Sequence, residues 1–107
     1  MKWEDRLKGY LGLAARAGRV QSGEEASVKA AQTGKARRLF LEDGAGENTR
    51  DRMQRLSEHY GIELTVISGL GEAIGKPGRK AAALTDEGLN RAIQQLINEY
   101  RGGVNEE

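Results

Sequence analysis

An uninterrupted apolar run, Leu39-Phe40-Leu41, is the feature that most constrains the fold. Such a run is typical of a strand that is covered on both faces. The glycine-rich turn 44–46 follows it, and Gly61 closes the next segment before an alternating strand over 62–66. Between the two glycine sites, residues recur at helical spacing, at Thr49, Met53, Leu56 and Tyr60. A strand, a helix and a second strand in this order predict two parallel strands.

Helical and strand patterns alternate through the rest of the chain, with short connections. This alternation predicts an α/β fold, a single three-layer αβα sandwich with a mixed sheet of about four strands, formed by residues 1–101. Gly102-Gly103 is expected to end the last helix and to leave 102–107 as a disordered tail. The other expected elements are helix 2–17, a strand at Val20, helix 24–33, strand 38–42, a helical turn at 70–74, strand 81–84 and a final helix capped by Thr85 or Asp86.

The second helix carries signals at both ends. Ser22 and Glu25 have the spacing of a capping box, in which the two side chains accept hydrogen bonds from free N–H groups of the first turn. This predicts a helix that begins at Gly23 or Glu24. Gly34 is expected to supply the left-handed conformation common at helix ends, and Lys35 follows with a charge suited to the negative end of the helix dipole.

The composition leaves little material for catalysis. The 107 residues, 37% of them hydrophobic, make one domain, and without cysteine and with His59 alone there is little supply of metal ligands or nucleophiles. Neither Gly34-Lys35 nor Gly75-Lys76 completes a phosphate-binding loop motif. Most paired acids lie at helix starts, while Glu42-Asp43 follows a central strand and stays a minor candidate for a ligand site. We expect a non-enzymatic protein with no catalytic residue, metal or cofactor.

The sequence has no membrane-targeting signal. No stretch approaches the roughly 18 apolar residues of a membrane span. Residues 1–10 also lack the apolar core of a signal peptide. A cytoplasmic location without a membrane partner is therefore expected.

Charge is segregated along the chain although the net charge is only +1. Residues 1–38 hold nine Lys or Arg against four acids, which leaves +5, and residues 39–107 hold eight against twelve, which leaves −4. Such asymmetry is expected of a protein with a side that faces nucleic acid. The alternative interpretation is that long helices simply carry solvated charge.

Several segments together resemble the bacterial YlxQ branch of the L-seven-Ae family, small ribosomal proteins that bind kink-turns in structured RNA. The resemblance implies the same αβα fold, and contacts to RNA from the start of the second helix and from the loop before the last strand. Gly23 and Lys29 fall on the glycine and lysine of the family motif, whereas Glu25 and Ala26 stand where that motif has an asparagine and a glutamate. The matching segments are 13–19 (LAARAGR), 22–25 (SGEE), 29–30 (KA), 34–36 (GKA), 39–43 (LFLED), 47–49 (ENT) and 73–76 (AIGK).

Two loops supply the groups that RNA recognition needs, a positive rim for phosphates and fixed polar groups for base edges. We expect Lys29, Lys76, Arg79 and Lys80 to contact phosphates and 23–25 to lie near bases. The alternative interpretation of the loop 76–80 is that it is an ordinary exposed turn with no role in binding. Structured RNA of ribosomal or kink-turn type, and the ribosome, are the expected partners, rather than DNA. The candidate RNA-binding residues are Arg19, Gly23, Glu24, Glu25, Lys29, Lys76, Pro77, Gly78, Arg79 and Lys80.

Two alternatives to this interpretation differ in how well the sequence supports them. Recognition of single-stranded RNA by stacking is disfavoured, because the aromatic residues Trp3, Phe40, Tyr60 and Tyr100 all fall on predicted core faces. The second alternative is a protein-interaction or ribosome-assembly accessory module that has kept the fold and lost kink-turn recognition.

Overall fold

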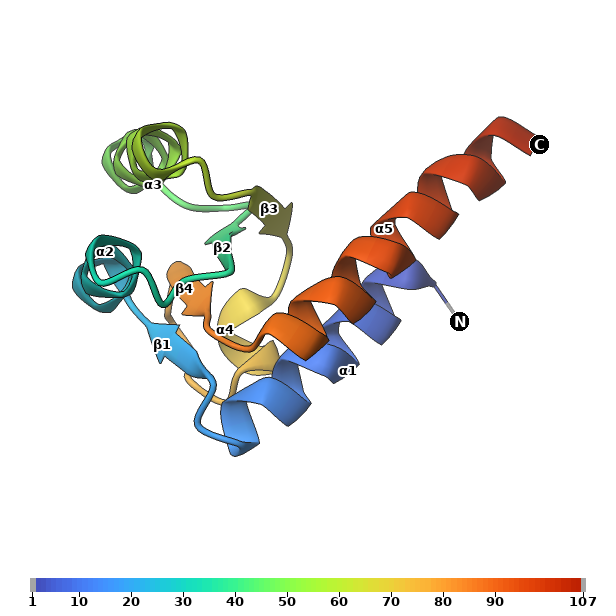
Figure 1. The fold of residues 1–107 in the computed structure, drawn as a ribbon, viewed down its shortest axis with the longest axis horizontal. Coiled ribbons are helices and arrows are strands. Elements are labelled where there is room, and N and C mark those ends of the chain that lie inside the picture. The colour runs from blue at the N-terminus through green and yellow to red at the C-terminus, as the bar shows by residue number, and fades with distance from the viewer. Residues whose placement is uncertain (1, 107) are drawn as a thin grey trace.

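The computed structural model describes the backbone of residues 2–106 and the side chains of residues 2–100 (Figure 1). The four strands form one sheet in the order β1-β4-β2-β3, in which β2 and β3 are parallel and the other pairs antiparallel. The elements are α1 (Trp3–Arg16), β1 (Val20–Ser22), α2 (Glu24–Gln32), β2 (Arg38–Glu42), α3 (Glu47–Tyr60), β3 (Leu64–Ile67), α4 (Leu70–Ala73), β4 (Ala81–Leu84) and α5 (Glu87–Glu106). This confirms the predicted parallel pair and the mixed sheet.

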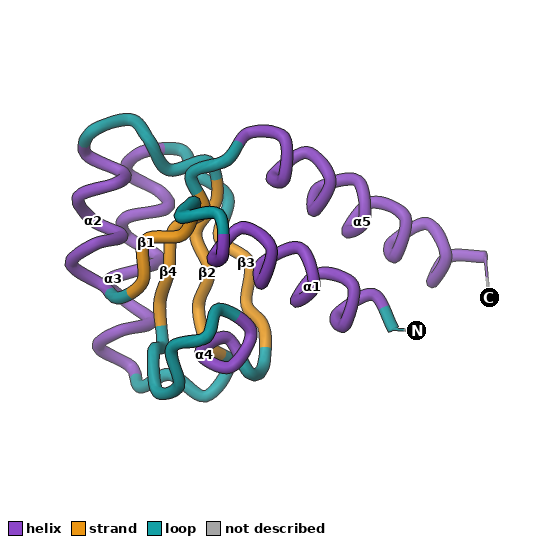
Figure 2. The backbone as a smooth tube through the Cα atoms, turned by 90° about the horizontal axis from the view of Figure 1, so that it is seen from below, coloured by secondary structure: helices purple, strands orange, loops and turns teal. Residues whose placement is uncertain are grey.

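Helices cover both faces of the sheet, so the three-layer prediction is also confirmed. The helices α2 and α3 lie on one face, and α1, α4 and α5 lie on the other (Figures 1 and 2). Along β2, Phe40 is buried toward α1 and α5, while Leu39 and Leu41 are buried toward α2 and α3. Side chains alternate across a strand, which is why the apolar run predicted a strand covered on both faces.

Small side chains in β4 bring the layers close together. Ala81, Ala82 and Ala83 are buried and pair with β2, and Ala82 and Ala83 also pair with β1. On one face, Ala81 and Ala83 pack in the same buried cluster as Ala30 and Ala31 of α2, so small side chains meet from both elements. β4 is therefore buried because it lies between β1 and β2 inside the sheet, and not because its side chains are bulky.

The ends of α1 and α5 extend together beyond the sheet (Figure 2). There the rings of Trp3 and Tyr100 stack, with 4.8 Å between their centroids. Tyr100 is 45% exposed and Tyr60, at the end of α3, is 39% exposed. The expectation that both tyrosines lie in the core is wrong, because Tyr100 lies where α5 extends beyond the sheet and Tyr60 is the last residue of α3. Phe40 is fully buried, as predicted.

The helix ends only partly follow the prediction. Gly34 has a φ of +74° and its neighbour Lys35 donates its N–H to the Ala30 carbonyl, which confirms the left-handed end of α2. Asp86 caps α5 by accepting the Leu89 N–H at 2.9 Å. The predicted stop at Gly102-Gly103 is wrong, since α5 continues to Glu106. Because glycine is a poor helix former, disorder of residues 102–107 in solution stays a prediction.

The predicted capping box at the start of α2 does not form. Gly23, not Ser22, is the residue before the helix, and no side chain of the described residues caps it. Ser22 ends β1 and pairs with Ala82, so the sheet fixes the serine outside the helix. The first turn is instead tied by the buried Ser27, whose hydroxyl donates to the Gly23 carbonyl at 2.7 Å.

Candidate nucleic-acid interface

One end of the sheet gathers the starts of two helices and the basic loop 76–80. Gly23, just before α2, donates its N–H to the Ala81 carbonyl at 2.7 Å. On the other side of β4, Glu42 donates its N–H to the Lys80 carbonyl at 2.8 Å, and α3 begins a few residues later. The structure therefore brings the start of α2 and the loop 76–80 side by side at the end of β4.

Gly23 holds a backbone conformation that favours glycine, with a φ of +103° and a ψ of 161°. A Cβ at this position would lie only 2.9 Å from Nη1 of Arg79. The guanidinium of Arg79 therefore rests against the bare backbone of Gly23. The glycine lets a cation from one predicted segment reach the helix start of the other.

The loop 76–80 is a tight turn folded over α4. Pro77 and Gly78 occupy the middle of the turn, Gly78 has a φ of +91°, and the Arg79 N–H is 3.1 Å from the Lys76 carbonyl. This is the pattern of a type II turn, in which proline presets the first central residue and glycine tolerates the second. All five residues, Lys76 to Lys80, are exposed. The turn thus presents three cations to solvent.

Gly71 in α4 makes room for this turn. Its carbonyl accepts the Lys76 N–H at 2.8 Å, and a Cβ on Gly71 would lie 2.8 Å from the Lys76 carbonyl oxygen and 2.9 Å from the Gly78 nitrogen. These contacts are with backbone, which cannot swing away as a side chain can. The basic loop therefore depends on Gly71, which lies outside the predicted set of RNA-binding residues.

Glu42 has a structural role at the end of β2. Its carboxylate accepts the N–H of Leu70 at 2.8 Å and of Gly69 at 3.2 Å, and so fastens the start of α4 to the end of β2. Burial by itself raises the pKa of this carboxyl. The N–H groups of Leu70 and Gly69 lower it. The Gly44 N–H and the charge of Lys80 act in the same direction, so the net result is a pKa below the ordinary value.

Neutralising Glu42 should make the fold less stable at neutral pH. Because the folded pKa lies below the ordinary value of 4.5, the ionised carboxylate stabilises the fold above about pH 4.5. That contribution is lost as the pH falls through the folded pKa. We expect Glu42→Gln to lower the free energy of unfolding by about 1 kcal/mol at pH 7, with a smaller difference at pH 3. Urea unfolding from pH 3 to pH 7 measures this, with the exposed neighbour Asp43→Asn as the control. A difference that does not change with pH would contradict the assignment.

The acids at the start of α2 are held by α3. Thr49 donates its hydroxyl to Oε2 of Glu24 at 2.8 Å, and Nη1 of Arg52 lies 3.4 Å from the other oxygen, Oε1. Nη2 of Arg52 lies 3.9 Å from Glu25, whose side chain is 93% exposed. Glu24, expected near base edges, thus has both carboxylate oxygens engaged. Thr49 and Arg52 were not predicted at the site, and their i, i+3 spacing is the signal for a shared helix face.

Two predicted residues lie elsewhere. Arg19 precedes β1, and its carbonyl accepts the Thr85 N–H at the opposite end of the strand from Gly23. Its guanidinium lies 3.9 Å from Asp86. Lys29 is exposed on α2 and lines a shallow hollow with Gln21 and Lys35. The structure therefore separates Arg19 from the basic loop and places Lys29 further along α2.

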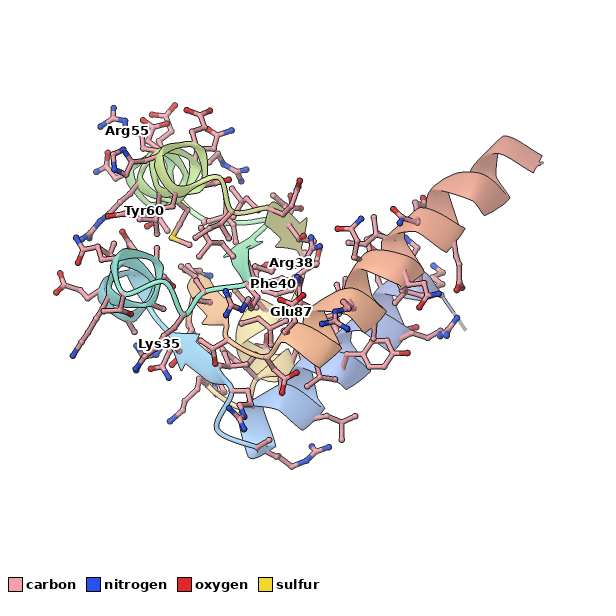
Figure 3. The ribbon with its side chains drawn as sticks, viewed as in Figure 1. Lys35, Arg38, Phe40, Arg55, Tyr60 and Glu87 are labelled. Carbon is pink, nitrogen blue, oxygen red and sulfur yellow. The ribbon has the colours of Figure 1, made fainter. Side chains whose placement is uncertain are left out.

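The charge segregation of the sequence is only partly a surface property. Arg38, one of the nine cations of the first 38 residues, is only 3% exposed and reaches from β2 toward α5 (Figure 3). Its guanidinium donates to Asn90 at 2.7 Å, to Thr65 at 2.8 Å and to Gln94. Arg37 lies 3.5 Å from Glu87. Both arginines thus serve the packing of α5 rather than the candidate interface.

Neither a metal site nor a membrane helix is found within the described part of the chain. Among the described side chains of residues 2–100, His, Asp and Glu form no group of three or more that could hold a metal ion. No helix in the same range has the length and apolar content to span a bilayer.

Known proteins resemble this chain in sequence and fold. It is 33% identical over 90 residues to the RNA-binding protein YlxQ of Enterococcus faecium, covering 81% of this chain and 86% of that protein. It is 31% identical over 91 residues to the RNA-binding protein YlxQ of Bacillus subtilis, covering 82% and 91%. No protein-family model matches the chain.

Solved structures share the fold. A protein of unknown function from Bacillus halodurans superposes with a TM-score of 0.79 at 36% identity, over 86% of this chain and 96% of that one. The 15.5kD RNA binding protein of Giardia lamblia superposes with a TM-score of 0.75 over 95% and 90%, at only 15% identity, and so shares the fold alone. Sequence identity above 30% over four fifths of its length shows that the chain belongs to the YlxQ family, which confirms the resemblance carried by its segments from Leu13 to Lys76.

Proposed function

We propose that the protein is a non-enzymatic, cytoplasmic RNA-binding protein of ribosomal type that recognises structured RNA. The observation that carries the proposal is the junction of Gly23 with the loop 76–80. Three exposed cations there adjoin a helix start, whose free N–H groups also favour anions. The names of the two YlxQ relatives support RNA as the ligand class.

The two sides of the junction serve different purposes. Lys76, Arg79 and Lys80 neutralise phosphates, which supplies affinity without sequence preference. The start of α2 meets base edges, where a glycine without a side chain permits close approach. Lys29 extends the positive rim along α2. Arg19, which faces Asp86 at the other end of β1, is the weakest member of the proposed set.

Recognition of a kink-turn is the finer form of the proposal. Glu25 stands where the family motif has asparagine, and its carboxylate can accept hydrogen bonds from a guanine edge. Because the capping box does not form, Glu25 is not used to cap α2 and is 93% exposed. Glu24, held by Thr49 and Arg52, contributes through the position of its backbone.

The test is binding of the purified protein to a standard kink-turn RNA and to the same RNA with its sheared guanines replaced, over a salt series. Tight binding that depends on the guanines is the expected result for kink-turn recognition. Steeply salt-dependent binding that ignores the guanines would leave a backbone-reading RNA protein. No binding to either RNA at low salt would overturn the proposal in favour of the protein-interaction alternative.

A further inference from the structure

We propose that Arg52 of α3 is a positioning residue for RNA binding, which acts by holding and neutralising Glu24 and Glu25 at the start of α2. This inference rests on the proposed function. No sequence motif includes Arg52, and the role follows from the packing of α3 beside α2 at the candidate interface.

Arg52 and Thr49 of α3 hold the acids at the start of α2, and we call this arrangement the clamp. One guanidinium nitrogen of Arg52 lies 3.4 Å from Glu24 and the other lies 3.9 Å from Glu25. Thr49, one turn earlier on the same face of α3, donates to the second oxygen of Glu24 at 2.8 Å. The clamp therefore holds the Glu24 carboxylate against α3.

Electrostatics give the clamp a functional consequence. Glu24 and Glu25 carry two negative charges within the first turn of α2, at the helix start where a phosphate backbone is expected to lie. Arg52 reduces the local charge from −2 to −1. At separations below the Debye length of about 8 Å, one unit of charge changes the affinity for a polyanion measurably.

The clamp also keeps the basic loop free for RNA. Arg79 rests against Gly23, the residue directly before Glu24. Without Arg52, the carboxylate of Glu24 or Glu25 becomes a competitor for this guanidinium. RNA phosphates would then have to displace an internal ion pair, and binding would weaken although no contact to RNA is removed.

The experiment is a mutant cycle read by binding of a fluorescently labelled kink-turn RNA at about 0.1 M salt. Arg52→Gln is expected to weaken binding about threefold to tenfold, with a smaller loss at higher salt. Arg52→Lys, which keeps the charge, is expected to restore most of the affinity. Glu24→Gln with Glu25→Gln gives the second background of the cycle, and adding Arg52→Gln to that pair should cost less than about twofold relative to the pair itself.

Arg55→Gln is the matched control. Arg55 lies one turn further along α3, is exposed, and points outward from the body of the molecule (Figure 3). It should bind like wild type, and thermal melting should show that every variant folds. An equal loss from Arg52→Gln in the wild-type and the double-glutamine backgrounds would overturn the inference, because Arg52 would then act on RNA independently of the acids. Failure of the wild-type protein to bind the kink-turn RNA, or the same RNA with its sheared guanines replaced, at low salt would overturn the proposed function itself.

Discussion

Replacing Lys76, Arg79 and Lys80 together by alanine is expected to weaken binding to structured RNA by about 100-fold at about 0.1 M salt. The three side chains are exposed on one turn, so the variant loses up to three phosphate contacts without a hole in the core. The slope of log affinity against log salt should fall by about 2 to 3. Titrations of one RNA at four or more salt concentrations measure both quantities.

The control for this variant removes the same charge from other surfaces. Lys2 and Arg6 lie at the far end of α1 and Arg55 lies on the outside of α3, and all three are exposed. Their triple replacement by alanine should change affinity only slightly, through net charge. A salt slope that stays the same after replacement of the loop cations would contradict their assignment to phosphates.

Gly71→Ala is expected to destabilise the protein by about 1–3 kcal/mol and to weaken RNA binding as well. The added methyl group would sit 2.8 Å from the Lys76 carbonyl oxygen and 2.9 Å from the Gly78 nitrogen, so the turn that carries the cations must move. Because Gly71 lies in the same short helix whose first N–H groups are bonded to Glu42, displacement of the turn also disturbs the start of α4. Urea unfolding and RNA titration of the same preparation separate the two effects.

Gly9→Ala provides the matched comparison. Gly9 is also a helical glycine, but among the described residues a Cβ there would meet no heavy atom within 4 Å beyond its chain neighbours and the adjacent backbone of its own helix. Alanine is the better helix former, so this variant should be more stable than wild type by about 0.5–1 kcal/mol and should bind RNA normally. A Gly71→Ala protein as stable as Gly9→Ala would show that the turn does not pack on α4 as described.

Prediction of the fold succeeded where the signal was local. The strands 38–42 and 81–84 are found with the bounds expected, and the helices begin and end within two residues of the predicted positions except at Gly102-Gly103. Burial of one face determines these elements, and the periodicity of apolar residues reports that burial directly. The capping box failed because pairing of Ser22 with Ala82 in the sheet overrode a preference within the helix.

Prediction of the candidate site was less complete. The two segments of the proposed interface were identified, and the structure places Gly23 against Arg79. The hold of Thr49 and Arg52 on Glu24 was missed, since it depends on how α3 is rotated against α2. The separation of Arg19 from Gly23 was missed as well, because three residues of β1 carry the chain from one end of the sheet to the other.

The sequence by itself determined which segments are helices and strands, that β2 is covered on both faces, and to which family the chain belongs, because these depend on short-range patterns of residue type. Only the tertiary structure decided which charges reach the surface together. Arg38 is buried against α5, Arg52 neutralises acids that precede it by more than twenty residues, and Arg79 rests against Gly23. Such contacts join residues that are far apart along the chain, and their distances are fixed by the packing of whole helices and strands.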